Sequence, residues 1–436
     1  MPPTTSPNWK CYATGKNPGK LGIFWWENID FQNKRVYIPT ARAHAREIWD
    51  YISESNRKVG IMNMPLTYPP RRVNGFVIAG GPDAPEKNYT YPKELETRLR
   101  REFGYKVHPV VRTNWWQSKE AIEKVIALIE NRFSVVKTLA REYKLDFLHL
   151  TIFYINSLHH DLWNDDSVAR AWQAIDRNIG YLLEEFKESN FIIMSDHGSN
   201  EIHQVFYINT WLEKQGYLKI RSSVWLPRLL YRMGLNENNL FRIAQKLHLI
   251  QVIKKMVPRK ILNNIPSAIG TVEMERKTDK IVWEKSKALG SGQGPLYLNS
   301  DETALKEDLV QKLEDLTNPL TGQRISRHVY RKEDIYKGDF FSEAPDIIID
   351  QSLHTHIRGS LGNKNVFEPQ QRWRAENTTE GIFIASGPDF IEGIEVNNVS
   401  ILDIAPTILH QMDIPVPADM DGRVLTEILR ETRVGD

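Results

Sequence analysis

The sequence is almost free of cysteine. Its 436 residues include a single cysteine, Cys11. One thiol cannot form an intrachain disulfide, and it cannot build a cysteine-based zinc cluster. Proteins that use so little cysteine are typical of reducing compartments, so we predict a cytoplasmic location.

The chain also lacks an excess of charge of either sign. Its 57 Lys and Arg residues nearly balance 55 Asp and Glu residues, which leaves a net charge of +2. Proteins whose main partner is nucleic acid or an anionic membrane usually carry a clear basic excess. The balance therefore argues against both as the main partner.

Long apolar runs are missing as well. No segment reaches the roughly 18 uninterrupted apolar residues of a membrane-spanning helix. The N-terminus does not resemble a signal peptide, because three of its first seven residues are proline and no apolar stretch follows. We therefore predict no transmembrane segment, and the oligomeric state is not readable from the sequence.

Short apolar runs alternate with amphipathic stretches over much of the chain. Residues 146–154 and 191–194 are apolar and strand-like, whereas residues 118–143 and 168–186 carry apolar positions at three- and four-residue spacing, as helices do. Strand, helix and strand in this order predict a βαβ unit with a parallel sheet. Ligands of such sheets bind outside the carboxyl ends of the strands, where this chain places His, Asp and Asn.

One stretch interrupts this alternation. Residues 220–275 are helical in pattern and basic, with no strand-like run. We interpret them as a helical insertion or cap, and a helical excursion on the core surface fits the pattern equally well. The predicted organisation is thus a core in two parts, residues 1–219 and 276–436, with the insertion between them. Further strands are predicted at residues 294–299, 344–350 and 381–387.

Three short motifs carry candidate chemistry: Thr5-Ser-Pro-Asn8, Asn156-Ser-Leu-His-His160 and Ser195-Asp-His-Gly198. Taken singly, each has an ordinary explanation as a turn, a helix cap or a pair of surface histidines. Two His-containing loops after neighbouring strands nevertheless make a metal site plausible, because imidazole and carboxylate are usual ligands of zinc, iron and manganese.

The combination and order of these motifs resemble the alkaline phosphatase superfamily, in its type I phosphodiesterase and nucleotide pyrophosphatase branch. Further matching motifs are Thr14-Gly15, Asn17-Pro-Gly19, Met64-Pro-Leu-Thr-Tyr-Pro-Pro70, Leu402-Asp-Ile-Ala-Pro-Thr-Ile-Leu409 and Met420-Asp-Gly422. The resemblance implies a three-layer α/β/α sandwich with a mostly parallel sheet. It also implies a metal-dependent phosphoric ester hydrolase with a small phosphorylated substrate, acting through a phospho-threonine intermediate.

The resemblance assigns roles to individual residues. Thr5 would be the nucleophile, and Asn8 would donate its amide to a phosphoryl oxygen. Asp196 and His197 would hold the cation that activates Thr5, and His160 would bind a second cation. Zinc and manganese are the expected metals.

The sequence departs from the family pattern at the second metal site. Asn156 and Asn377 stand where the family has Asp and His, and neutral amides are poor zinc ligands. His354 and His356 could replace a lost ligand, although we interpret them as surface histidines. We therefore expect one strong cation site, at Thr5, Asp196 and His197.

The family also places a metal-binding Asp on a strand upstream of the nucleophile, and this sequence begins four residues before Thr5. We expect that a first strand of the sheet is missing here and that the natural start lies upstream. We also expect the chain with its upstream segment to be more stable. Two alternatives to the hydrolase remain: a single-metal phosphotransferase of the same superfamily, and a catalytically silent member that binds a phosphorylated ligand or a partner.

Overall fold

The chain folds into two compact units. The computed structural model describes residues 2–39, 45–109, 119–221, 274–371 and 373–430. Unit I contains Met1–Pro2, Gly22–Pro39 and Asn200–Glu376, and unit II contains Pro3–Leu21, Thr40–Ser199 and Asn377–Asp436. The predicted helical insertion at residues 220–275 falls almost entirely outside the described residues.

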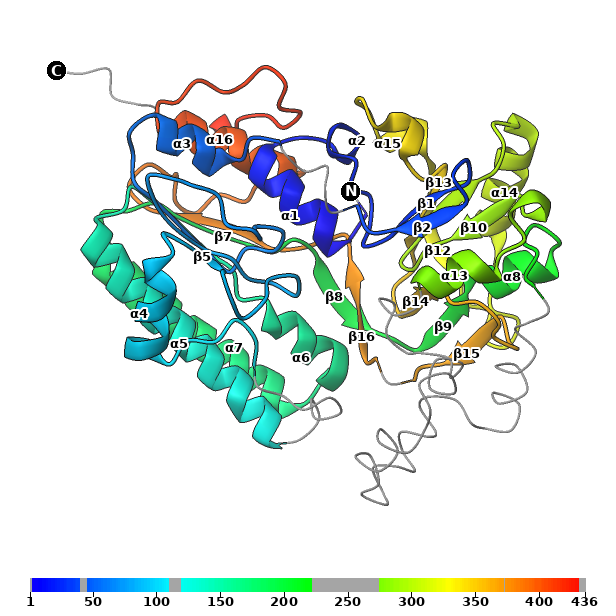
Figure 1. Cartoon of the computed structure of the whole chain (residues 1–436), viewed down its shortest axis with the longest axis horizontal. Coiled ribbons are helices and arrows are strands. Elements are labelled where there is room, and N and C mark those ends of the chain that lie inside the picture. Colours follow the sequence, from blue (N-terminus) through cyan, green and yellow to red (C-terminus); the bar gives the residue numbers. More distant parts are fainter. Residues whose placement is uncertain (1, 40–44, 110–118, 222–273, 372, 431–436) are drawn as a thin grey trace. The chain divides into compact units, whose positions relative to one another are not determined.

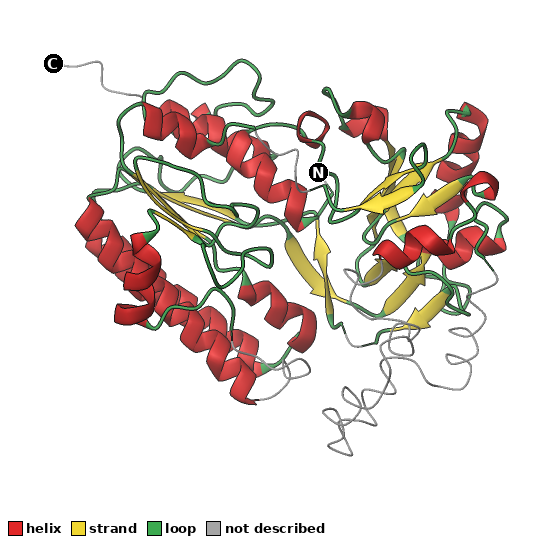
Figure 2. Cartoon of the chain, viewed as in Figure 1, coloured by secondary structure: helices red, strands yellow, loops and turns green. Residues whose placement is uncertain are grey.

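Unit II is a three-layer α/β/α sandwich, as the sequence predicts (Figures 1 and 2). Its strands are β3 (Val59–Met62), β4 (Gly75–Ile78), β5 (Thr90–Tyr91), β6 (Phe147–Leu150), β7 (Phe191–Met194) and β17 (Phe383–Ser386). Its helices are α1 (Thr5–Thr14), α2 (Pro18–Leu21), α3 (Ile48–Glu54), α4 (Glu94–Phe103), α5 (Lys119–Tyr143), α6 (Tyr154–Leu162), α7 (Asp166–Glu185), α16 (Ile404–Gln411), η5 (Ile401–Asp403) and η6 (Thr426–Ile428).

The sheet of unit II is mainly parallel and is covered by helices on both faces. Strands follow the order β5-β4-β3-β6, and β3 pairs in parallel with both β4 and β6. All four residues of β3 are buried. Alternate side chains point to opposite faces, so Met62 joins a core with α4, α5 and α7, whereas Ile61 joins a second core with α1, α3 and α16.

The helices form where the apolar spacing predicts them. In α5 and α7, residues such as Ile129, Phe133, Ile175 and Leu182 lie on the face that packs against the sheet. The start of α7 is fixed by Asp165, whose side chain accepts a hydrogen bond from the Ser167 backbone N–H at 2.8 Å. The predicted helices at residues 118–143 and 168–186 correspond to these two helices.

The two strands of the predicted βαβ unit do not pair with each other. Among the described residues, β6 pairs with β3, and β7 pairs antiparallel with β17. Both strands still belong to one layer, because Leu148 and Phe191 pack against one core and Phe147 and Ile192 against the other. Packing against the helices, rather than a shared hydrogen-bond ladder, holds them together. An upstream strand in this sheet stays a prediction.

Unit I is built mostly from antiparallel strands (Figure 2). A four-stranded antiparallel sheet has the order β10-β11-β13-β12, and β9 pairs in parallel with β14 and antiparallel with β15. The strands are β1 (Asn28–Asp30), β2 (Arg35–Tyr37), β9 (Gln204–Tyr207), β10 (Ala288–Gly290), β11 (Pro295–Leu298), β12 (Ser326–Arg331), β13 (Ile347–Gln351), β14 (Thr355–Arg358) and β15 (Phe367–Pro369). The helices are α8 (Ile208–Lys214), α13 (Met274–Lys280), α14 (Thr303–Asp315), α15 (Lys332–Ile335), η3 (Trp283–Lys285) and η4 (Phe341–Glu343).

Two further strands, β8 (Gly198–Glu201) and β16 (Ala375–Thr378), each contain a point at which the chain passes from one unit to the other. The Ser195–Gly198 motif and Asn377 lie on the unit II side of these points. Across the described ranges, the structure has no helix that is both long and apolar enough to cross a membrane.

Candidate active site

Thr5 is the first residue of helix α1 in unit II. The preceding residue, Thr4, is extended with φ −115° and ψ 125°, and its side chain makes no capping hydrogen bond to the helix. Pro7 lies in the first turn, where a missing backbone N–H costs little. The first N–H groups of a helix have no intrahelical acceptor, so the start of α1 favours a negatively charged group.

His197 lies directly against Thr5. The distance from Thr5 Oγ1 to His197 Nε2 is 3.2 Å, and both residues are buried. His197 Nδ1 lies 2.9 Å from the Gly198 carbonyl oxygen, which can only accept a hydrogen bond, so Nδ1 carries the proton. In the neutral imidazole, Nε2 therefore presents its lone pair to Thr5. A backbone carbonyl that orients a histidine in this way is typical of metal-ligating imidazoles.

Asp196 lies next to His197 and is the third residue of the candidate site. Its side chain is nearly buried, and its Oδ2 lies 3.3 Å from His197 Nε2. Burial raises the pKa of the Asp196 carboxyl, while His197 and a hydrogen bond from Trp9 act in the opposite direction. Asn8 Nδ2 donates a hydrogen bond to the Asp196 carbonyl oxygen at 2.6 Å. One turn of α1 thus fixes both the backbone and the carboxyl group of Asp196.

The Ser195–Gly198 turn packs backbone to backbone against the segment that follows Asn377. A Cβ atom on Gly198 would lie 2.0 Å from the Glu380 carbonyl oxygen and 2.5 Å from Thr378 Oγ1. Ser195 Oγ accepts a hydrogen bond from the Ile382 backbone N–H at 2.9 Å. The glycine of the motif is therefore required by close packing, which holds His197 in place.

We predict that Gly198→Ala damages both the fold and the site. The added methyl group must displace the Glu380 backbone or the turn itself, which costs about 1–3 kcal/mol of unfolding free energy. Because His197 is oriented by the Gly198 carbonyl, hydrolysis should fall about 100-fold. Thermal unfolding and a phosphodiester assay measure the two effects. The matched control is Gly180→Ala on α7, which adds a methyl group in open space without a left-handed backbone. Unchanged activity in Gly198→Ala would contradict the packing argument.

The residues present suit a divalent cation. Asp196 Oδ2 and Asn8 Oδ1 are buried and have no hydrogen-bond partner among the described residues. A buried carboxylate oxygen without a partner is costly, and a bound cation would offset that cost. Thr5, Asp196 and His197 supply oxygen and nitrogen donors. Only two of these three residues are of the types His, Cys, Asp or Glu. Within the described part of the chain, no group of three or more His, Cys, Asp or Glu side chains is placed to hold a metal ion.

The second predicted site is only partly assembled. Asn156 and His160 lie one turn apart on α6, and both are half-buried. Their helix approaches the Ser195–Gly198 motif through His159, whose Nδ1 lies 3.4 Å from Ser199 Oγ. Burial lowers the pKa of His159 to about 4, with smaller contributions from His160 and His197. Thus His160 lies in the neighbourhood of the first site.

Asn377 is tied to the nucleophile segment. Its Nδ2 donates a hydrogen bond to the Pro3 carbonyl oxygen at 3.0 Å, two residues before Thr5. The amide therefore has a structural contact at the position where the resemblance implies a histidine. The structure brings Thr5, Asn8, Asp196 and His197 into direct contact and connects Asn377 to the same segment.

The interpretation of His356 as a surface histidine is wrong. His356 lies in unit I, is 8% exposed, and its Nδ1 is hydrogen-bonded to the buried Glu376 carboxylate. His354 stacks on His203 with ring centroids 4.1 Å apart. Trp9 also donates a hydrogen bond to Asp196, a role that the sequence pattern alone does not assign, although Trp9 directly follows Asn8 in the motif.

The fold is alkaline-phosphatase-like. The chain belongs to the type I phosphodiesterase / nucleotide pyrophosphatase family, whose model matches residues 1–381. The chain is thus an enzyme of the phosphoric ester hydrolase class. No curated protein matches it by sequence.

Several solved structures share the fold at low sequence identity. Phosphonoacetate hydrolase from Sinorhizobium meliloti 1021, in complex with phosphonoformate, has a TM-score of 0.58 and 14% identity over 93% of this chain and 84% of its own. An inactive murine ectonucleotide pyrophosphatase / phosphodiesterase 5, with one threonine replaced by alanine and in complex with AMP, has a TM-score of 0.50 and 12% identity over 98% and 88%. Alkaline phosphatase PafA has a TM-score of 0.51 and 10% identity over 99% and 90%.

Proposed function

We propose that this chain hydrolyses phosphodiesters with Thr5 as the nucleophile. The observation that carries the proposal is the contact between Thr5 Oγ1 and His197 Nε2 at the start of α1, with Asp196 beside them. Thr5 Oγ1 would form a bond to phosphorus as the bond to the leaving group breaks. Water would then cleave the phospho-threonine and restore the hydroxyl.

The surrounding residues have defined tasks in this reaction. Asn8 has two amide N–H groups, and one of them donates to Asp196, which leaves the other for a phosphoryl oxygen. The first turn of α1 offers backbone N–H groups to the same negative charge. Trp9 and Asn8 hold Asp196 in place.

Thr5, Asp196 and His197 would hold one divalent cation, zinc or manganese. When bound, this cation would lower the pKa of the Thr5 hydroxyl and offset the charge of the phosphoryl group. His160, Asn156 and Asn377 offer one imidazole and two neutral amides, so a second cation should bind weakly. The inactive murine relative, in which one threonine is replaced by alanine, supports a threonine nucleophile, and its AMP supports a small phosphorylated substrate.

We predict that the full chain binds about one equivalent of zinc or manganese tightly, and that Asn156→Asp with Asn377→His raises this toward about two. The added carboxylate and imidazole supply the charge and the donor that the amides lack. Elemental analysis and hydrolysis of bis-p-nitrophenyl phosphate test the prediction, and hydrolysis should increase with the second equivalent. Asn156→Gln is the neutral control, because Asn156 is only half-buried. Two equivalents in the unsubstituted protein would contradict the one-site proposal.

A single-cation phosphotransferase is the second candidate. The amides at Asn156 and Asn377 favour it, because the resemblance gives such transferases one cation held by an acidic residue, Thr, Asp and His. A transferase passes the phosphoryl group from Thr5 to an alcohol, whereas a hydrolase passes it to water. Product analysis with added glycerol distinguishes the two reactions.

A cytoplasmic location remains our proposal, because the chain contains a single cysteine.

A further inference from the structure

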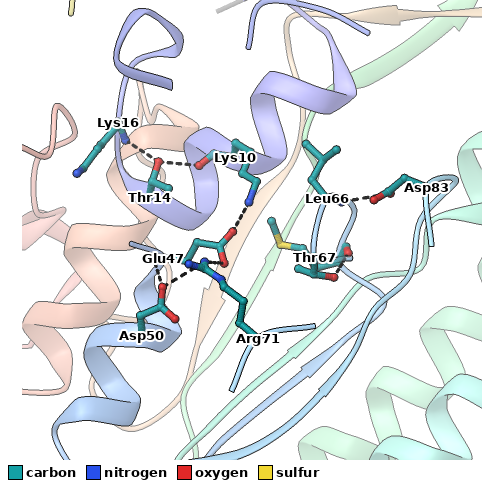
Figure 3. A network of polar contacts seen from close by, with 10 residues as sticks. Lys10, Thr14, Lys16, Glu47, Asp50, Leu66, Thr67, Arg71 and Asp83 are labelled. Atoms are coloured by element: carbon teal, nitrogen blue, oxygen red, sulfur yellow. Dashed lines mark hydrogen bonds and ion pairs between the residues drawn. The ribbon is translucent and has the colours of Figure 1, made fainter. Parts of the chain in front are cut away.

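Helix α1 carries a buried ion pair five residues beyond Thr5. Lys10 Nζ donates a hydrogen bond to Glu47 Oε1 at 2.5 Å, and the two side chains are only 4% and 3% exposed (Figure 3). Taking two charges out of water is costly, and the cost is offset only when both groups are well paired.

Glu47 connects three separate segments of unit II. Its second oxygen, Oε2, accepts a hydrogen bond from Arg71 at 2.5 Å, in the loop that follows β3. Glu47 precedes the first residue of α3, and its backbone N–H donates to Asp50 Oδ2 at 2.8 Å. Arg71 also lies 3.3 Å from Asp50 Oδ2. The carboxylate thus joins α1, the start of α3 and the β3 loop, as Figure 3 shows.

The far end of α1 is held by a different set of contacts. Gly15 ends the helix in the left-handed conformation with φ 65°, and its carbonyl oxygen accepts a hydrogen bond from the Asp421 backbone N–H at 2.7 Å. Lys16 pairs there with Asp419, whose side chain is 60% exposed. Of these tethers, the Lys10–Glu47 pair is buried and lies nearer to Thr5 along the helix.

We propose that Lys10 and Glu47 are positioning residues that hold α1 so that Thr5 Oγ1 stays within reach of His197 Nε2. The inference rests on the proposed function of Thr5. Neither residue has to contact substrate, because each acts through the placement of the helix. A displacement of the reacting group by about 1 Å can lower a rate about 100-fold. Such a displacement of α1 would break the hydrogen bond between Lys10 and Glu47 and leave the Lys10 ammonium buried without this partner.

The test compares Lys10→Met, Glu47→Gln and the double variant of the full chain. Lys10→Met leaves Glu47 paired with Arg71, so it should fold with a Tm close to that of the unsubstituted protein. Glu47→Gln leaves the Lys10 ammonium buried without a carboxylate, so its Tm should fall clearly. The double variant removes both charges, and its Tm should recover. In Lys10→Met and the double variant, kcat for bis-p-nitrophenyl phosphate should stay at least about 10-fold low, with KM changed less than about twofold.

Asp419→Asn is the matched control at the far end of α1. It removes the charge of the exposed carboxylate that pairs with Lys16, just beyond the end of the helix, and we expect kcat, KM and Tm to be unchanged. If kcat is normal in Lys10→Met, or returns with Tm in the double variant, the pair is merely structural and the inference is overturned. If Thr5→Ala retains activity, the proposed function fails and the inference with it. If Thr5→Ala is inactive but Lys10→Met is fully active, the proposed function stands and only the inference about Lys10 and Glu47 is overturned.

Discussion

Replacing Thr5 by alanine should lower kcat/KM for phosphodiester hydrolysis on the order of 10³-fold or more, because it removes the atom that attacks phosphorus. The loss should appear in kcat, since Asn8 and the first turn of α1 would still bind the phosphoryl group. Steady-state kinetics with bis-p-nitrophenyl phosphate, at saturating zinc or manganese, measures the change.

Thr5→Ser is the matched control for this prediction. Serine keeps the hydroxyl and removes one methyl group from a buried position, so activity should stay within about 10-fold of the unsubstituted enzyme. Both variants should unfold at similar temperatures, because Thr5 is a small side chain at a helix start. Substantial hydrolysis by Thr5→Ala would exclude Thr5 as the nucleophile.

Replacing Asp196 by asparagine should abolish tight binding of the single cation and lower hydrolysis by about 10³-fold. Asp196 is the one carboxylate among the three proposed ligands, and a neutral amide is a poor ligand for zinc. Asparagine has nearly the same shape, so the hydrogen bond from Asn8 to the backbone carbonyl of this residue should persist. Elemental analysis and the phosphodiester assay give the two readouts.

The Tm of Asp196→Asn shows whether a loss of activity comes from the loss of a metal ligand or from unfolding of the protein. Burial raises the pKa of the Asp196 carboxyl, which means that its charged form is disfavoured in the metal-free protein. In the absence of metal, Asp196→Asn should therefore unfold at the same temperature as the unsubstituted protein or higher. Added zinc should raise the Tm of the unsubstituted protein and not that of the variant. A variant that binds zinc normally would contradict the ligand assignment.

The candidate site could be proposed from the sequence because its residues lie in short motifs whose combination and order resemble those of the type I phosphodiesterase and nucleotide pyrophosphatase branch. Thr5 and Asn8 are one helical turn apart, and Asp196 and His197 follow a strand whose apolar run is plain in the sequence. The helices α5 and α7 were predictable for a similar reason, because long amphipathic patterns are the clearest local signal. In these regions, the local pattern and the final packing agree.

Other features depend on contacts that no local pattern encodes. The antiparallel pairing of β7 with β17 joins residues almost two hundred positions apart, so the βαβ pattern around β6 and β7 could not reveal it. The buried state of His356 depends on a hydrogen bond to Glu376, which lies twenty residues further along the chain in a different sheet. Lys10 and Glu47 are both polar and would be expected at the surface. Only the folded chain shows that each neutralises the other in the interior.

The most direct test of this account is to look for the covalent intermediate on Thr5. The full chain with bound cation is mixed with bis-p-nitrophenyl phosphate, quenched in acid within a single turnover and analysed by peptide mass spectrometry. We expect the peptide containing Thr5 to carry the p-nitrophenyl phosphoryl group, with one p-nitrophenolate released per modified chain, and Thr5→Ala to show no such adduct. Hydrolysis without any adduct on Thr5, or with the adduct on another residue, would contradict the role of Thr5 as nucleophile.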